Sequence, residues 1–390
     1  MLNTDYEYNE VLLMEHITAS GRCTGCAACA VLCPVQCITM TPDAEGFLRP
    51  VIDQDACLDC GKCARACPVN ADPVSYPAPT AYAAINTDDE TRRLSSSGGV
   101  FALLAHAILA DGGAVCAPVF AEDFSVRHIV TRDPADIVRM QGSKYVQSDI
   151  GDCYTTVKTL LEDGIPVLFS GTPCQTGGLQ AALGRRYDNL YLQDIICHGV
   201  PSPMVWKKYL AEQSTPVRSA SFRDKSNGWL TFSMRIETEQ GVHCQTLQKD
   251  PYLKLFLRDL DLRPSCYDCA FKSVGRPADL TLADYWGVGR AQPDFFDGKG
   301  TSLLLVHSAK GQALLDRVSA SLRITKTDLA AAISFNPAAD RSVACPAARD
   351  TFFADFDRKT IPAQAEALCR ESAAAKAKNL LRRAVNKIRK

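Results

Sequence analysis

The sequence CTGCAACAVLCP, residues 23–34, returns with the same cysteine spacing as CLDCGKCARACP, residues 57–68. Both copies have the pattern Cys-x2-Cys-x2-Cys-x3-Cys-Pro, which is typical of the ligands of paired 4Fe-4S clusters. Three thiolates on one tight loop bind one face of a cubane. The fourth binds the other cluster, because the chain turns away at the Cys-Pro step. The repeat therefore predicts a small α+β module that carries two clusters.

The crossed pattern assigns all eight ligands of this module. One cluster is expected on Cys23, Cys26, Cys29 and Cys67, and the other on Cys57, Cys60, Cys63 and Cys33. The segment resembles the bacterial two-cluster ferredoxin family. The alternative is a pair of zinc sites, but zinc knuckles do not use a third Cys-x2-Cys step followed by Cys-Pro. Cys37 is interpreted as a small packing residue rather than a ninth ligand.

Length and composition limit the remaining possibilities. A chain of 390 residues favours a small module joined to one large domain. The formal net charge of -1 argues against nucleic acid as a partner. The 18 cysteines follow an N-terminus without a basic and then apolar leader, so we expect a cytoplasmic protein whose thiols serve metal or redox chemistry. No apolar run is long enough to span a bilayer.

Four segments are expected along the chain. A ferredoxin module (1–72) and a proline-rich linker (73–80) precede a mixed α/β domain (81–350), and a basic helical tail (351–390) follows. In the large domain we expect a helix after residues 95–99, a hairpin of 114–120 and 125–131, and a parallel strand-helix-strand unit from 165 to 196. A second hairpin is predicted at 217–223 and 230–238, and further strands at 279–285 and 302–307. The tail is either a solvated terminal helix or a contact for an anionic partner or membrane surface.

Six short motifs follow the module in order: SSSGGVF (95–101), QGSKYVQS (141–148), FSGTPCQ (169–175), DIICHGVPSP (194–203), CYDC (266–269) and ADLTLADYWG (278–287). Together with the cysteine repeat they resemble the coenzyme F420 hydrogenase/dehydrogenase beta subunit family. The resemblance implies an enzyme that binds FAD, holds a further 4Fe-4S cluster in the large domain, and exchanges electrons with a soluble organic compound. Archaeal members use coenzyme F420 and plant and cyanobacterial relatives reduce a chlorophyll-type pigment, so the substrate stays open.

The candidate flavin site begins at a helix N-terminus preceded by small residues, which suits a pyrophosphate. Its candidate residues are Ser96, Ser97, Gly98, Gly99, Lys144, Tyr145, Gln147 and Thr172. Lys144 could supply a cation to a phosphate or to the flavin ring, and Tyr145 a packing aromatic. The alternatives are an ordinary serine N-cap and a surface lysine. Lys144 and His198 are the candidate catalytic residues, although His198 fits a plain loop histidine equally well.

A third cluster is expected on Cys174, Cys197, Cys266 and Cys269. Cys174 and Cys197 follow the two strands of one parallel crossover, so their loops should meet at one sheet edge, and the last two cysteines have ligand spacing. A zinc site, a dithiol pair and unlinked core thiols are the alternatives. The five other cysteines of the large domain and tail are interpreted as structural. Weaker candidates for the site walls are Asp279, Asp284, Trp286, Lys272 and Arg276.

The sequence thus predicts an iron-sulfur flavoprotein oxidoreductase. One alternative is an electron-input beta subunit of an F420-reducing hydrogenase or F420H2 dehydrogenase complex, and another is a ferredoxin-type adaptor without flavin. The expected partners are a redox protein (a ferredoxin, or a hydrogenase or dehydrogenase subunit) and a small organic substrate.

Overall fold

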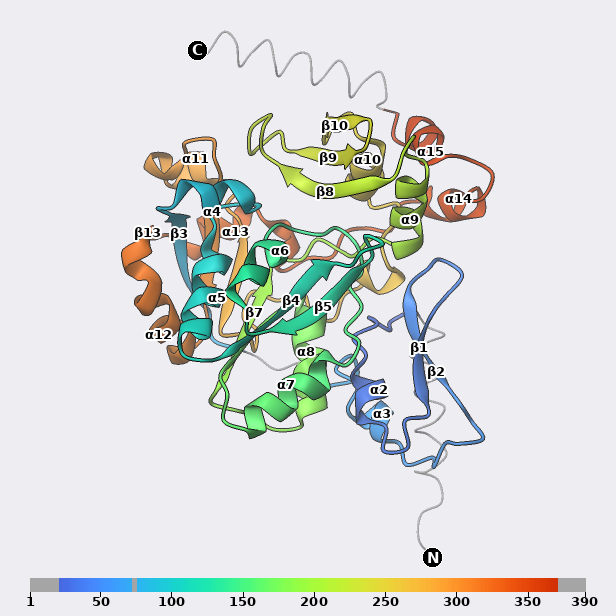
Figure 1. Ribbon diagram of the computed structural model, residues 1–390, viewed down its shortest axis with the longest axis horizontal. Coiled ribbons are helices and arrows are strands. Elements are labelled where there is room, and N and C mark those ends of the chain that lie inside the picture. Colours follow the sequence, from blue (N-terminus) through green and yellow to red (C-terminus); the bar gives the residue numbers. More distant parts are fainter. Residues whose placement is uncertain (1–20, 72–75, 371–390) are drawn as a thin grey trace, which may run out of the picture.

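The computed structural model describes residues 21–71 and 76–370 (Figure 1). At its N-terminal end, helices α2 (Ala28–Leu32) and α3 (Lys62–Arg65) lie beside a hairpin of β1 (Ile38–Pro42) and β2 (Leu48–Ile52). The repeat in the sequence is also a repeat in the backbone. Gly25 and Asp59 stand at equivalent positions and both have positive φ, as do Ala27 and Gly61. Because Asp59 and Ala27 carry side chains that disfavour this region, the tight cysteine loops impose the conformation.

The large domain is built on an eight-stranded sheet with the order β13-β3-β12-β11-β7-β6-β4-β5. Strands β4, β6, β7 and β11 are parallel neighbours, and antiparallel strands complete both sides. The strands are β3 (Thr80–Asn86), β4 (Ala114–Phe120), β5 (Val126–Thr131), β6 (Val167–Ser170), β7 (Leu190–Ile195), β11 (Leu280–Asp284), β12 (Ser302–Val306) and β13 (Leu322–Lys326). The central strand β6 is buried throughout, as expected for a parallel strand covered on both faces.

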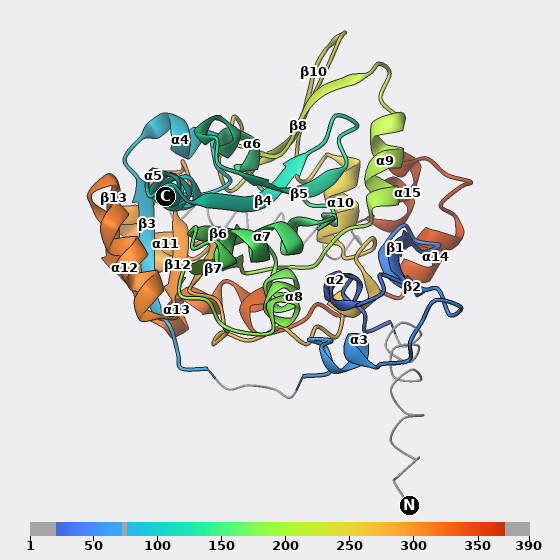
Figure 2. The ribbon, with the colours of Figure 1, turned by 60° about the horizontal axis from the view of Figure 1, so that its bottom comes forward.

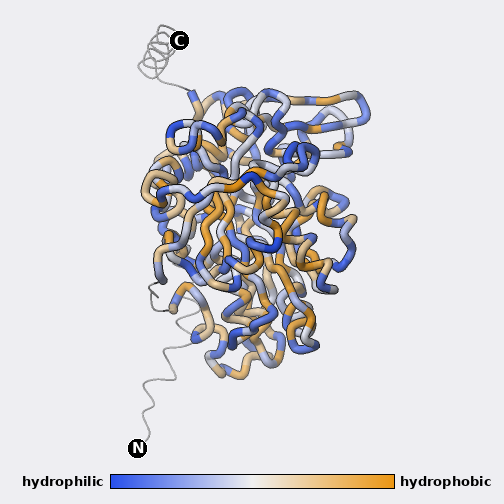
Figure 3. Tube along the Cα trace, turned by 90° about the vertical axis from the view of Figure 1, so that its left-hand side faces the viewer, coloured by the Kyte–Doolittle hydropathy of each residue, from blue (hydrophilic) through white to orange (hydrophobic). Residues whose placement is uncertain are grey.

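Helices cover both faces of this sheet (Figure 2). Alternate strand residues such as Val115 and Leu168 pack against α5, α6 and α12. Their neighbours Cys116 and Phe169 point to the opposite face, against α7 and α8. The helices are α4 (Asp89–Leu94), α5 (Val100–Ala110), α6 (Ile137–Met140), α7 (Cys153–Glu162), α8 (Pro173–Leu183), α11 (Val288–Ala291), α12 (Ala309–Val318) and α13 (Leu329–Ser334). The apolar residues accordingly follow the strands inside the molecule (Figure 3).

A second, smaller core lies beside the main sheet. It combines a three-stranded antiparallel sheet with four helices: β8 (Val217–Asp224), β9 (Ser233–Thr238), β10 (Gly241–Thr246), α9 (Pro203–Ala211), α10 (Pro251–Leu257), α14 (Arg349–Ala354) and α15 (Ile361–Leu368). Aromatic rings fill this core, and the Trp206 and Phe222 ring centroids are 4.6 Å apart. The layer closes over the main sheet and provides one wall of the site described below (Figure 1).

The predicted helix after residues 95–99 is α5, the predicted hairpins are β4–β5 and β8–β9, and the predicted parallel crossover is β6-α8-β7. These predictions are confirmed. The prediction missed β10 and β13, and it missed β3, which starts at Thr80 and lies between β12 and β13. Residues 72–75, which span the end of the predicted module and the start of the predicted linker, lie outside the described residues, as do tail residues 371–390 with nearly all of the tail's basic run. In the described part of the chain, no helix is both long and apolar enough to cross a membrane.

Candidate functional site

The first group of thiols in the N-terminal module is Cys23, Cys26, Cys29 and Cys67. Cys23 and Cys26 are buried. Burial, with smaller contributions from the neighbouring Cys67 and Cys23, raises the pKa of the Cys26 thiol to about 11. Burial raises the pKa of Cys29 still more, again with the other three thiols as neighbours. The structure therefore brings these four thiols together in a site that disfavours unpaired thiolates.

The second group surrounds a cavity at the outer end of the module. Cys33, Cys57, Cys60 and Cys63 line it, together with Cys37. The Sγ atoms of Cys33 and Cys37 are 3.4 Å apart, so Cys37 lies against this group. Cys60 is exposed. The second group thus faces outward, whereas the first faces the large domain.

The module is held on the large domain by specific contacts. Helix α2 packs on α8, where a Cβ placed on Gly178 would lie 2.8 Å from the Cβ of Cys26. Glycine is therefore needed in α8 for this close approach. The Arg349 guanidinium pairs with Glu45 at 2.8 Å. The Leu48 amide donates to the Gln147 side-chain oxygen at 3.0 Å.

A third group of thiols lies in the large domain. Four cysteines line one cavity there: Cys174 in the first turn of α8, Cys197 after β7, and the pair Cys266 and Cys269. Burial raises the pKa of Cys197 and of Cys266 to about 12. Cys26 of the first group acts electrostatically on Cys174, so the two groups are neighbours. Across the described residues, no three His, Cys, Asp or Glu side chains converge closely enough to hold a single metal ion.

A cavity of about 780 Å³ adjoins this third group. Cys174, Cys197 and His198 line both spaces. The cavity lies at the carboxyl ends of the parallel strands, where Ser170, Ile195 and Asp284 are the last residues of β6, β7 and β11. This is the usual ligand position in open α/β sheets. The volume falls within the roughly 300–1,000 Å³ of typical small-molecule and cofactor sites.

Seven of the eight predicted cofactor residues line the large cavity: Ser96, Ser97, Gly99, Lys144, Tyr145, Gln147 and Thr172. Gly98 does not. It faces the sheet, where a Cβ would lie 2.3 Å from the Ala84 carbonyl oxygen. Gly99 has φ +82° and precedes the first residue of α5, so the start of this helix faces the cavity. Gly98 therefore packs the loop of residues 95–99 against the sheet and does not contribute to the cavity wall.

The two candidate catalytic residues are both tied to neighbours. The Lys144 ammonium donates to the Met140 and Gln141 carbonyls at the end of α6, at 3.1 and 3.0 Å. Burial, with a smaller effect of Arg139, lowers the pKa of Lys144 to about 7. The His198 Nε2 atom lies 2.6 Å from the Asp259 carboxylate.

The prediction missed Arg223, which lies in β8 and lines the large cavity. Its buried guanidinium forms a two-point ion pair with Asp284 at 2.7 and 2.9 Å and donates to the Tyr145 hydroxyl at 2.9 Å. The Arg223 Nε atom is buried and has no hydrogen-bond partner within the described part of the chain. Asp284 and Trp286 were predicted as wall residues and do line the cavity. A lone arginine in a strand carries no spacing signal, which explains why it was missed.

The other weak candidates have structural partners. Asp279 accepts from the Leu192 amide at 2.8 Å and does not line the large cavity. Arg276 pairs with buried Asp194 at 3.3 Å, and Lys272 donates to the Cys197 carbonyl. Both basic residues line the third thiol cavity.

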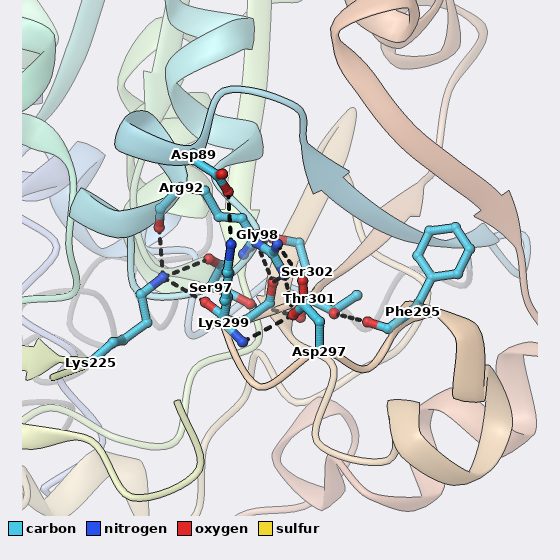
Figure 4. A network of polar contacts seen from close by, with 11 residues as sticks. Asp89, Arg92, Ser97, Gly98, Lys225, Phe295, Asp297, Lys299, Thr301 and Ser302 are labelled. Carbon is cyan, nitrogen blue, oxygen red and sulfur yellow. Dashed lines mark hydrogen bonds and ion pairs between the residues drawn. The ribbon is translucent and has the colours of Figure 1, made fainter. Parts of the chain in front are cut away.

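The loop of residues 95–99 is held from outside by Lys225. Its ammonium donates to the carbonyls of Arg92, Ser97 and Lys299 at 2.6, 3.1 and 2.9 Å (Figure 4). The Ser302 hydroxyl accepts from the Gly98 amide at 3.0 Å on the sheet side. The loop that opens α5 toward the cavity is thus fixed on two sides.

Comparison with known families gives three matches. Residues 22–71 match the 4Fe-4S dicluster domain. Residues 81–152 and 166–332 match, respectively, the N-terminal and C-terminal parts of the coenzyme F420 hydrogenase/dehydrogenase beta subunit. Among curated proteins, none matches this chain. A solved structure titled as a xenon derivatization of the F420-reducing NiFe hydrogenase complex from Methanosarcina barkeri is similar at 17% identity and a TM-score of 0.44, over 65% of this chain and 84% of that chain.

Proposed function

Because this chain belongs to the coenzyme F420 hydrogenase/dehydrogenase beta subunit family, we propose that it is an iron-sulfur flavoprotein oxidoreductase. It would exchange electrons between three 4Fe-4S clusters, FAD and a small organic acceptor or donor. The observation that carries the proposal is the order of the sites. The second thiol group faces outward, the first adjoins the third, and the third shares Cys174 and Cys197 with the large cavity.

The third thiol group fits a cluster. Four cysteines surround a cavity rather than a point, which suits a cubane better than a single zinc ion. Arg263 is in the wall, and its buried Nη1 atom has no hydrogen-bond partner among the described residues. A cluster sulfur would be an acceptor for such a donor. When bound, the cluster passes single electrons between the module and the large cavity.

The large cavity fits a flavin dinucleotide. The start of α5 behind Ser96, Ser97 and Gly99 offers backbone amides and the positive end of a helix dipole to a pyrophosphate. Arg223, whose charge is paired with Asp284, adds a buried Nε–H donor that has no hydrogen-bond partner among the described residues. FAD, when bound, converts between one-electron and two-electron steps.

The catalytic roles follow from the contacts of His198 and Lys144. The Asp259 carboxylate orients the imidazole of His198, which lines the large cavity, so this side chain can hold or release a proton at the substrate. Lys144 lines the cavity and is bound to backbone carbonyls at the end of α6, and because burial lowers its pKa to about 7, it can also exchange a proton near neutral pH.

A second candidate function is that of an electron-input subunit within a larger redox complex. The observation that favours it is the outward position of the second thiol group. The exposed Cys60 stands beside the exposed apolar side chains of Val35 and Leu58. A partner protein covering these residues would approach the second cluster before any other.

The test is a count of iron, sulfide, zinc and flavin after anaerobic purification. Twelve ligand cysteines at four per cluster predict about twelve irons per chain, with about one FAD. Cys269→Ser should remove about four irons, whereas Cys345→Ser, at an exposed thiol outside all three groups, should remove none. A count of about eight irons and one zinc per chain would mean that the third thiol group binds zinc instead of a cluster. A chain without flavin would be an electron-transfer adaptor.

A further inference from the structure

Arg263 lies between the first and third thiol groups. It is 1% exposed. Its Nε atom donates to the Cys23 carbonyl at 2.7 Å, and its Nη2 atom donates to the Leu48 carbonyl at 2.9 Å. The same Nη2 atom is 3.7 Å from the Cys23 Sγ atom, a ligand position of the first cluster. The guanidinium therefore contacts the module directly, although it belongs to the large domain.

The other side of Arg263 belongs to the third group. The side chain lines the cavity of the four thiols there, three residues before Cys266. Its charge opposes the rise that burial causes in the pKa of Cys266. A Cβ placed on Gly25 would lie 2.8 Å from the Arg263 Nη1 atom, so the loop between Cys23 and Cys26 approaches the guanidinium without a side chain between them.

No carboxylate pairs with Arg263 in the described part of the chain. A buried and unpaired positive charge is costly unless another negative group compensates it. A cluster with four thiolate ligands carries net negative charge, and one-electron reduction adds another. The Arg263 guanidinium, 3.7 Å from the Cys23 Sγ atom, would stabilise the reduced form of such a cluster, because buried charges are weakly screened.

We propose that Arg263 is a cation shared by the first and third clusters and that its charge raises the reduction potentials of both. The part that concerns the third cluster rests on the proposed function. The part that concerns the first cluster rests on the 4Fe-4S dicluster domain alone.

The test compares neutral variants, Arg263→Gln and Arg263→Met, with the charge-retaining Arg263→Lys in the full chain. Each cluster is titrated with dithionite and mediators and followed by EPR. At the potential where the first cluster of the wild type is half reduced, the neutral variants should show at least a tenfold lower ratio of reduced to oxidised cluster. This change is about 59 mV for a one-electron couple. Arg263→Lys should stay within about threefold of the wild type, which is less than 30 mV on the same scale.

Two controls separate charge from docking. Glu45→Gln breaks the ion pair with Arg349, another contact that holds the module, and leaves in place the bonds from Arg349 to the Leu262 carbonyl; Glu45 lines neither the second nor the third thiol cavity. It should leave the potentials unchanged. The second cluster is an internal control, because Arg263 does not line its cavity.

Unchanged potentials in neutral variants with full iron would overturn the proposal. Loss of iron from both neutral variants, but not from Arg263→Lys, would assign a scaffold role instead of tuning. A wild type with only about eight irons would refute the third cluster of the proposed function. The shift at the first cluster would still be decided by its own EPR signal.

Discussion

Replacing Asp261 by asparagine should stabilise this protein, and more so as the pH rises. The Asp261 carboxyl is fully buried, and neither of its oxygens has a hydrogen-bond partner in another residue within the described part of the chain. Burial raises its pKa from 3.8 to about 8, with Asp259 adding to the rise and Arg349 opposing it. At neutral pH the folded protein therefore holds a protonated carboxyl, which asparagine imitates in shape and charge.

The sign and size of the effect follow from proton linkage. Between pH 3.8 and about 8 the unfolded chain ionises Asp261 and the folded chain does not. The folded state then binds more protons, so its stability falls as the pH rises, by about 1.4 kcal/mol per pH unit. At pH 7 the accumulated cost relative to a neutral side chain is about 4 kcal/mol as an upper bound. Asp261→Asn removes this cost.

The assay is thermal unfolding of wild type and Asp261→Asn at one scan rate and at pH 6.0, 6.75 and 7.5. The advantage of the variant should grow by about 2 kcal/mol over this range. Asp188→Asn, at an exposed carboxyl, is the matched control and should show little change. The infrared band of a protonated carboxyl should also disappear in Asp261→Asn. An advantage that does not vary with pH, or a destabilised variant at pH 7, would refute the reasoning.

Two further predictions concern the large cavity. Lys225→Met removes three hydrogen bonds from the carbonyls that fix the loop before α5, so FAD affinity should fall at least tenfold while iron content is retained. Lys299→Met, which loses only an exposed pair with Asp89 at 3.3 Å, is the control, and equal flavin binding in both variants would contradict the role of the loop. Burial lowers the pKa of His128 from 6.5 to about 4. Below pH 6.5 the imidazole is therefore protonated in the unfolded state but stays neutral in the folded state, so the free energy of unfolding decreases as the pH falls. The wild type should therefore lose about 2 kcal/mol more stability than His128→Gln between pH 6.5 and 5, and parallel unfolding profiles would argue against a neutral buried imidazole.

The thiol groups could be anticipated because cluster chemistry demands fixed spacings, and a spacing is visible in a sequence. The crossover that carries Cys174 and Cys197 was equally readable, since buried parallel strands form apolar runs around a helix. Cys266 and Cys269 reach the same cavity only through long-range packing. Their grouping rested on the order of motifs and on the sheet-edge argument.

Other parts of the site left no trace in the sequence. Arg223 and Arg263 matter through what surrounds them, and neither belongs to a periodic or repeated pattern. Gly98 and Gly99 are adjacent and look interchangeable, yet one faces the sheet and the other the cavity. Strand β3 was hidden because it follows a proline-rich stretch and pairs with β12 and β13, more than 200 residues away in the sequence.

The close seat of Cys26 against Gly178 has a consequence for protein engineering. With no room for a side chain at that position of α8, the module and the large domain form a matched pair of surfaces. A foreign ferredoxin grafted in place of residues 22–71 would bring its own clusters but not this fit. To restore electron exchange, the graft must also carry Gly25 and the carboxylate of Glu45. It must further present a strand amide that donates a hydrogen bond to the side-chain oxygen of Gln147. A ferredoxin with the same cysteine spacing would therefore still not replace this module unless its surface around the first cluster also fitted the large domain.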